Sequence, residues 1–199
     1  SKVMSMTDKA MGAKGVEIGA NLGCNEGAIA YVSPSFSGLT VGVAGYALSA
    51  SGGDQDAFDA VDLGLMYSNG PLSVNVAFEN DKRAATAAFH SGDSTSIGAS
   101  YAMGDMTVAA TFQTTEFDTA GKADEDDTSI ALTYAMGNNK LVLGWNDNET
   151  SAAAVVTDTN SNVIELQHSF SKHTAAYVNF YNSDVADADT TSFGLQHTF

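Results

Sequence analysis

The sequence predicts an all-β fold of antiparallel strands, and three observations predict it. Apolar residues alternate with small or polar ones at a period of two in many segments, for example residues 72–79. Short connections rich in Gly and Asn recur at a spacing of about 34 residues. Longer polar connections lie between them. Helical repeat arrays share that spacing, but they alternate with a helical period and not with a period of two.

The predicted strands follow one another along the chain as hairpins. About eleven are expected, near residues 28–33, 39–47, 61–67, 72–79, 97–103, 106–112, 130–136, 141–145, 164–170, 174–180 and 191–199. Short turns are expected at 34–38, 69–70, 104–105, 137–139 and 171–172. Long loops are expected at 49–57, 80–93, 118–127, 150–161 and 183–190. All short turns should therefore lie at one end of the sheet and all long loops at the other.

The charge is strongly negative and unevenly placed. The chain has 24 acidic and 8 basic residues, for a net charge of -16. Nucleic-acid binding needs a basic face, so this partner is excluded. Most of the acids fall in or beside the long loops, whereas Asp105 is the acid at a short turn. One end of the predicted sheet is therefore acidic.

The two faces of the predicted strands favour a membrane barrel over a soluble sandwich. One face carries small or polar residues such as Gly64, Ser73 and Thr111, which suit a hydrated interior and do not fill a core. The other face is apolar, and a strand of about 9–11 residues can cross a bilayer. Aromatic residues are expected at two levels of this face, as in interfacial girdles. A soluble barrel with aromatic plugs is the alternative.

Three motifs resemble the general porins of Gram-negative bacteria. Tyr-Ala-Met-Gly occurs at 101–104 and again at 134–137, and it is similar to turns at the inner edge of these porins. Residues 31–38 resemble the segment that leaves their constriction loop. The C-terminal strand, with Phe193, Leu195 and Phe199, resembles the signal that the outer-membrane barrel assembly machinery recognises.

This resemblance implies a bacterial outer-membrane location and an antiparallel transmembrane β-barrel of about 16 strands. Such porins are usually homotrimers in contact with lipid and lipopolysaccharide, and their third long loop folds into the pore. The first strand predicted here would be the sixth of the barrel. Residues 1–27 would then be a remnant of the constriction loop, and residues 28–199 would be barrel strands. We expect the chain to be incomplete or to be completed by another chain.

The implied function is a water-filled channel for passive diffusion of ions and small hydrophilic solutes. An outer-membrane surface protein that acts through its loops, as an adhesin or phage receptor, is the alternative. The alternation places Asp62, Glu79 and Glu165 on the pore-facing side. Further pore-lining candidates are Glu17, Glu26, Lys82 and Arg83. Opposed charges across a constriction filter solutes, and the excess of acids predicts a mild preference for cations.

Catalytic chemistry is not predicted. The sequence lacks the nucleophile-elbow, P-loop and dinucleotide-binding patterns, and its four histidines lack the spacing of zinc ligands. No cofactor is required for diffusion. Acidic clusters in the predicted loops offer the oxygen ligands that Ca²⁺ or Mg²⁺ prefers, although solvated loop surfaces are the alternative. These candidates are Asp124, Glu125, Asp126, Asp127, Asp184, Asp187 and Asp189.

Overall fold

The computed structural model describes residues 28–46, 58–82, 91–118, 122–152, 155–186 and 189–198. These residues form eleven strands in a single sheet, and every strand pairs antiparallel with its neighbours in the sequence. Within these ranges no helix has the length and apolarity to cross a membrane. The predicted all-β antiparallel fold is confirmed.

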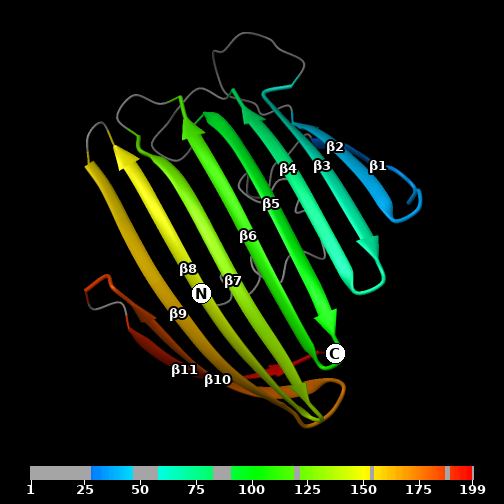
Figure 1. Ribbon diagram of the computed structural model, residues 1–199, viewed down its shortest axis with the longest axis vertical. Helices are drawn as coiled ribbons and strands as arrows, with labels where there is room; N and C mark the ends of the chain where they lie inside the picture. Colours follow the sequence, from blue (N-terminus) through cyan, green and yellow to red (C-terminus); the bar gives the residue numbers. More distant parts are fainter. Residues whose placement is uncertain are drawn as a thin grey trace.

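The strands lie close to the predicted segments. They are β1 (Ala28–Val32), β2 (Leu39–Tyr46), β3 (Ala60–Asn69), β4 (Leu72–Asp81), β5 (Gly92–Met103), β6 (Met106–Phe117), β7 (Asp124–Met136), β8 (Asn139–Ala152), β9 (Val155–Ser169), β10 (Thr174–Ser183) and β11 (Thr190–His197). Their tight turns share one end of the sheet and the long connections share the other (Figure 1).

Three of the tight turns place glycine first in a two-residue loop. Gly70, Gly104 and Gly137 have φ angles of 56°, 59° and 61°, which L side chains rarely adopt. Glycine is the preferred residue at this position of a type II′ hairpin turn. The first of these turns is therefore Gly70-Pro71, one residue later than the predicted 69–70, since β3 continues through Asn69.

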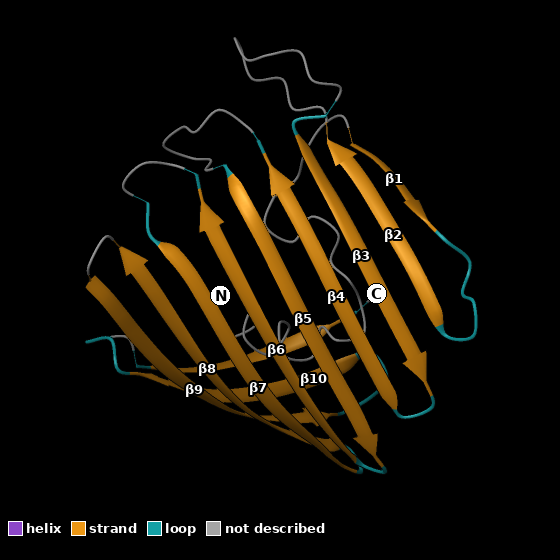
Figure 2. Ribbon diagram, turned by 45° about the horizontal axis from the view of Figure 1, so that its top comes forward, coloured by secondary structure: helices purple, strands orange, loops and turns teal. Residues whose placement is uncertain are grey.

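The sheet curves into a trough, so its two faces differ (Figure 2). Side chains crowd together on the concave face, where even small residues such as Ala131 and Ser129 are only 1% and 3% exposed. Side chains spread apart on the convex face, where Ile97 and Ile164 are 49% and 50% exposed. The strand register places these residues on opposite faces, because side chains alternate along each strand.

The convex face carries an aromatic row close to the tight turns. Tyr67, Tyr101 and Tyr134 stand on β3, β5 and β7 at matching levels, and all three are exposed. His168 lies at the same end, where its Nδ1 is 2.8 Å from Asn139 Oδ1. This row has the position expected of an interfacial girdle.

The prediction of long loops at 118–127 and 150–161 is wrong for much of both segments. Asp124 to Asp127 belong to β7, and β8 and β9 extend through Ala152 and from Val155. Strands β7 to β9 have 13, 14 and 15 residues, so they run past the apolar band of the convex face. Beyond that band the residues on both faces are mostly polar, and the alternation that reveals a strand is lost.

Candidate functional site

The concave face brings together acidic residues from distant parts of the sequence. Asp62 on β3 lies directly opposite Glu79 on β4. Glu165 on β9 lies farther along the same face, between Val142 and Asn179 of the flanking strands. The three acids that the alternation assigned to one side therefore do share one face.

Tyr46 fixes the orientation of Asp62. Its hydroxyl donates a hydrogen bond to Asp62 Oδ2 over 3.0 Å. Both side chains are buried, at 7% and 4% exposure. A buried carboxyl group needs such partners, because its desolvation is costly. The alternation of β2 gives Tyr46 to the concave face, together with Ala44.

Hydrogen bonds between side chains stiffen the middle of the concave face. Gln113 Nε2 donates to Ser94 Oγ and Thr115 Oγ1, each over 3.3 Å. Asn146 Nδ2 donates to Ser129 Oγ over 2.9 Å and to Asp127 Oδ1 over 3.4 Å. A wall of this composition offers a hydrated surface with donors and acceptors already oriented.

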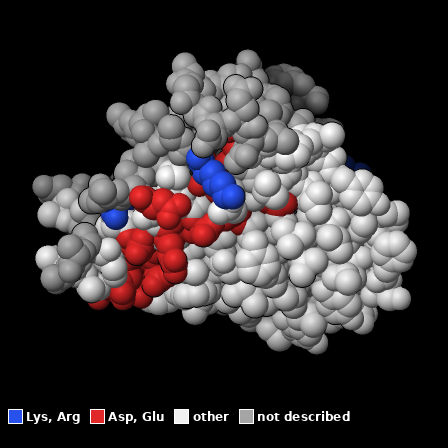
Figure 3. All heavy atoms as spheres, turned by 90° about the horizontal axis from the view of Figure 1, so that it is seen from above, with Lys and Arg blue, Asp and Glu red and all other residues white. Residues whose placement is uncertain are grey.

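Acids outnumber bases on this face among the strand residues that the structure describes. The acids assigned to it by register are Asp62, Glu79, Asp81, Glu125, Asp127 and Glu165. Lys140 is the base, and it pairs with Gln167 of β9. Seen from the end that carries the long connections, Asp and Glu gather in one patch of the described surface (Figure 3).

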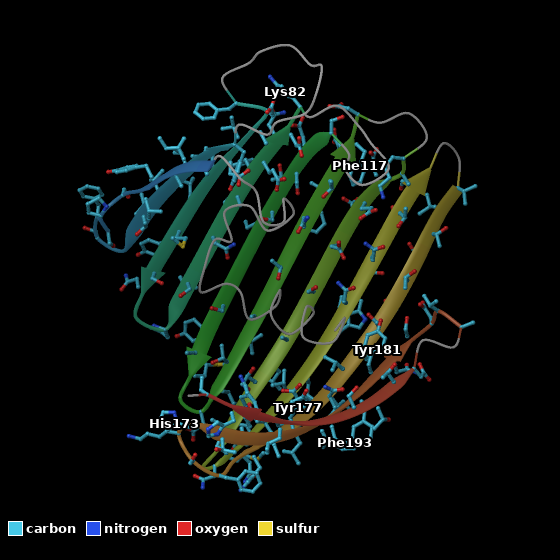
Figure 4. The ribbon with its side chains drawn as sticks, turned by 180° about the vertical axis from the view of Figure 1, so that it is seen from behind. Lys82, Phe117, His173, Tyr177, Tyr181 and Phe193 are labelled. Atoms are coloured by element: carbon cyan, nitrogen blue, oxygen red, sulfur yellow. The ribbon has the colours of Figure 1, made fainter. Side chains whose placement is uncertain are left out.

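Lys82 directly follows Asp81, the last residue of β4. It is exposed, and its backbone N–H donates to the carbonyl of Asp59 over 2.8 Å. It lies at the end of the sheet with the long connections (Figure 4). Several predicted site residues lie outside the described ranges: Glu17, Glu26, Arg83, Asp187 and Phe199.

The first acidic cluster does not form the loop that the sequence predicted. Asp124 and Asp126 point to the convex face of β7, whereas Glu125 and Asp127 point to the concave face, because side chains alternate along a strand. Glu125 forms an ion pair with Lys122, with 2.9 Å between Oε1 and Nζ. Within the described residues, no group of three or more metal-ligating side chains converges.

The second acidic cluster organises the connection after β10. Asp184 accepts hydrogen bonds from the backbone N–H of Asn160, over 2.9 Å to Oδ1 and 3.0 Å to Oδ2. Asp189 Oδ1 accepts from Asn182 Nδ2 over 2.9 Å and from the backbone N–H of Ser183 over 3.1 Å. Asp184 and Asp189 therefore accept backbone N–H groups of β9 and of the end of β10, and Asp commonly accepts such bonds beside turns.

The concave face also carries aromatic residues for which no role was predicted from the sequence. Tyr46, Tyr177 and Tyr181 occupy concave positions by register. The alternation around Val178 and Phe180 carries this information, since residues between apolar outward positions must point inward. The predicted girdles on the apolar face include none of these three tyrosines, and no role was predicted for inward aromatic residues.

Comparison with known proteins shows which family this chain belongs to. A family model described as Gram-negative porin matches residues 4–188. The chain belongs to the Gram-negative porin family. Its location is therefore the bacterial outer membrane. No curated protein matches the sequence.

Solved porins have the same fold. An anion-selective porin from Comamonas acidovorans is 18% identical, with a TM-score of 0.72 over 88% of this chain and 60% of that one. OmpT of Vibrio cholerae, expressed in the outer membrane, is also 18% identical, with a TM-score of 0.65 over 88% of this chain and 65% of that one. The chain thus spans less than two thirds of the length of either porin. At this identity the likeness concerns the fold alone.

Proposed function

We propose that this porin wall lines a water-filled channel for passive diffusion of ions and small hydrophilic solutes. The observation that supports it is the contrast between the faces. The concave face is polar and tightly hydrogen bonded, and the convex face exposes residues such as Phe112 and Leu166 at 45% and 44%. A bilayer solvates such a convex face, and water solvates the concave one. Diffusion down a gradient needs neither catalysis nor a cofactor.

The remaining architecture is part of the same proposal. Residues 28–199 would be strands of a barrel of about 16, in a homotrimer that contacts lipid and lipopolysaccharide. Residues 1–27 would belong to the constriction loop, and the terminal strand would be recognised by the assembly machinery. At the acidic connections, binding of Ca²⁺ or Mg²⁺ and solvated loop surfaces are two alternatives that the proteolysis experiment in the Discussion distinguishes.

A mild preference for cations follows from the charges of the concave face. In the described strands this face carries six acidic residues and one basic residue, Lys140. Charged walls concentrate counter-ions inside a narrow water-filled space. The anion-selective porin from Comamonas acidovorans shares the fold. Its name shows that a porin of this fold can be anion-selective, so the preference for cations proposed here rests on the wall charges alone.

Planar-bilayer recording of the full chain purified in detergent tests both parts. Stepwise ohmic openings in KCl would support a channel, and openings in triplets would support a trimer. In a salt gradient, we expect a reversal potential of the cation-selective sign. A triple variant, Asp62→Asn with Glu79→Gln and Glu165→Gln, should lower the cation-to-anion permeability ratio by about twofold or more.

Glu116→Gln is the matched control, because Glu116 lies on the convex face and is exposed. It removes one acid without altering the concave wall, so the permeability ratio should stay unchanged. An anion-selective reversal potential for the unmodified protein would contradict the cation preference alone. Silence from a folded, heat-modifiable protein would contradict the channel, and would favour a surface protein that acts through its loops.

A further inference from the structure

A strip of aromatic and polar side chains on β10 and its neighbours adds two tyrosine rings to the concave face, and of its members only Glu165 contributes to the ionic selectivity above. We propose that this strip binds neutral saccharides, as a chain of pyranose rings, during their passage. The inference rests on the proposed channel function and names a solute class for it. Tyr177 and Tyr181 define the strip, since both are half-buried on the concave face of β10. They stand about 13 Å apart along the strand.

The ring of Tyr177 lies over the neighbouring strand β11. Gly194 of β11 is directly opposite it, and a Cβ added at Gly194 would lie 2.6 Å from both Cζ and the hydroxyl oxygen of Tyr177. The missing side chain therefore makes room for the ring. Covering a strand glycine with an aromatic ring stabilises a sheet. Tyr177 stays half-exposed on the inner side of the sheet (Figure 4).

A polar floor separates the two rings. Asn179 is 3% exposed between them, and its Oδ1 makes no hydrogen bond within the described structure. Glu165 lies directly opposite Asn179 on β9, and Ser192 lies opposite it on β11. A buried amide oxygen without a partner is rare and requires a hydroxyl or water to satisfy it. Asn179, Glu165 and Ser192 thus supply hydrogen-bond acceptors between the rings of Tyr177 and Tyr181.

Both tyrosines face inward, away from the lipid. Figure 4 shows them on the inner side of β10, whereas Phe193 of β11 points outward. Phe193 is 87% exposed and pairs with Val178, which also belongs to the convex face. An inward aromatic ring gains nothing from lipid, so its exposed face is available to a solute.

Saccharides combine the two properties that the strip selects. One side of a pyranose ring presents C–H groups, which contact the electron-rich face of an aromatic ring. Its edge carries hydroxyl groups, which donate to amide and carboxylate oxygens. Two plates on one strand with acceptors between them fit a linear oligosaccharide. Small ions would interact with the polar acceptors but would not stack on the tyrosine rings.

A titration of the full chain in detergent with maltotriose, followed by saturation-transfer difference NMR, tests this directly. We expect saturable binding at millimolar strength, weakened about tenfold by Tyr177→Leu and by Tyr181→Leu. Tyr177→Phe keeps the ring and should remain within about twofold of the unmodified protein. Tyr67→Leu on the convex face is the matched control and should leave binding unchanged. Heat modifiability verifies that each variant is folded. If Tyr177→Leu does not fold, Tyr181→Leu alone tests the contribution of the aromatic rings.

The outcomes separate this inference from the channel itself. Binding measured this way does not require conduction, so saccharide binding by a protein silent in bilayers would support the strip and reject the channel. Ohmic openings in KCl without maltotriose binding would reject the strip and keep the channel. Equal affinity in the unmodified protein and in both leucine variants would overturn the proposal. Binding of choline in place of maltotriose would overturn it in favour of organic cations.

Discussion

The hydroxyl of Tyr46 on β2 reaches diagonally to the carboxyl group of Asp62 on the neighbouring strand β3. In the register Tyr46 faces Ala60, and Asp62 faces Ala44. The 3.0 Å hydrogen bond therefore joins diagonal neighbours of one face, which long aromatic side chains can do. Small residues at both directly opposed positions leave room for the tyrosine ring to bend toward the acid.

Tyr46→Phe should destabilise the folded protein without altering its shape. The change removes a donor from a buried carboxyl group, which costs about 1–3 kcal/mol. Urea unfolding in detergent, followed by tryptophan fluorescence, measures the free energy of unfolding. Tyr134→Phe on the convex face should change it by less than about 0.5 kcal/mol. Equal losses in the two variants would show that the Tyr46 hydroxyl contributes nothing specific.

Gly137→Ala should weaken the hairpin of β7 and β8 through backbone strain alone. Gly137 has a φ of 61°, and an added Cβ would meet no atom within 4 Å. An L residue in this conformation costs about 1–2 kcal/mol. Gly137→Asn should lose less, since Asn tolerates positive φ. If alanine and asparagine lower the urea midpoint equally, the loss has another cause.

The sequence predicted the elements well where the two faces of a strand meet different solvents. In β4 one face carries Asn75 and Glu79 and the other Val76 and Phe78, so alternation reveals the strand. At the acidic end of β7 to β9 both faces meet water, and the same rule failed. The site was predictable to the same extent. Parity assigned Asp62, Glu79 and Glu165 to one face, but contacts between diagonal neighbours such as Tyr46 and Asp62 depend on strand register.

The extended ends of β7 to β9 place like charges opposite one another. Asp126 pairs with Glu149, and Glu149 pairs with Asp158, all on the convex face. Directly opposed like charges destabilise a sheet by about 0.2–1 kcal/mol for each pair. Glu149→Gln should therefore raise the free energy of unfolding in a buffer of low ionic strength.

Salt dependence identifies the cause of that gain. Raising the ionic strength to about 1 M shortens the Debye length to about 3 Å and should remove most of the difference from the unmodified protein. Asp105→Asn at a tight turn is the control and should give little change at either salt concentration. A gain for Glu149→Gln that persists at high salt would point to packing and not to repulsion.

The carboxylates after β10 should hold their connection without calcium. Asp184 already accepts two hydrogen bonds from the backbone N–H of Asn160, and Asp189 accepts two more. Asp184→Ala should therefore speed proteolysis of this connection, whereas Asp184→Asn keeps an acceptor and should lose less. Limited proteolysis followed by mass spectrometry measures the cleavage rate in Ca²⁺ and in EDTA. Ca²⁺ should leave the rate unchanged in all three proteins, because both oxygens of Asp184 and Oδ1 of Asp189 already accept hydrogen bonds from protein donors. Protection by Ca²⁺ that is present in the unmodified protein and lost in Asp184→Ala would instead establish a metal site here.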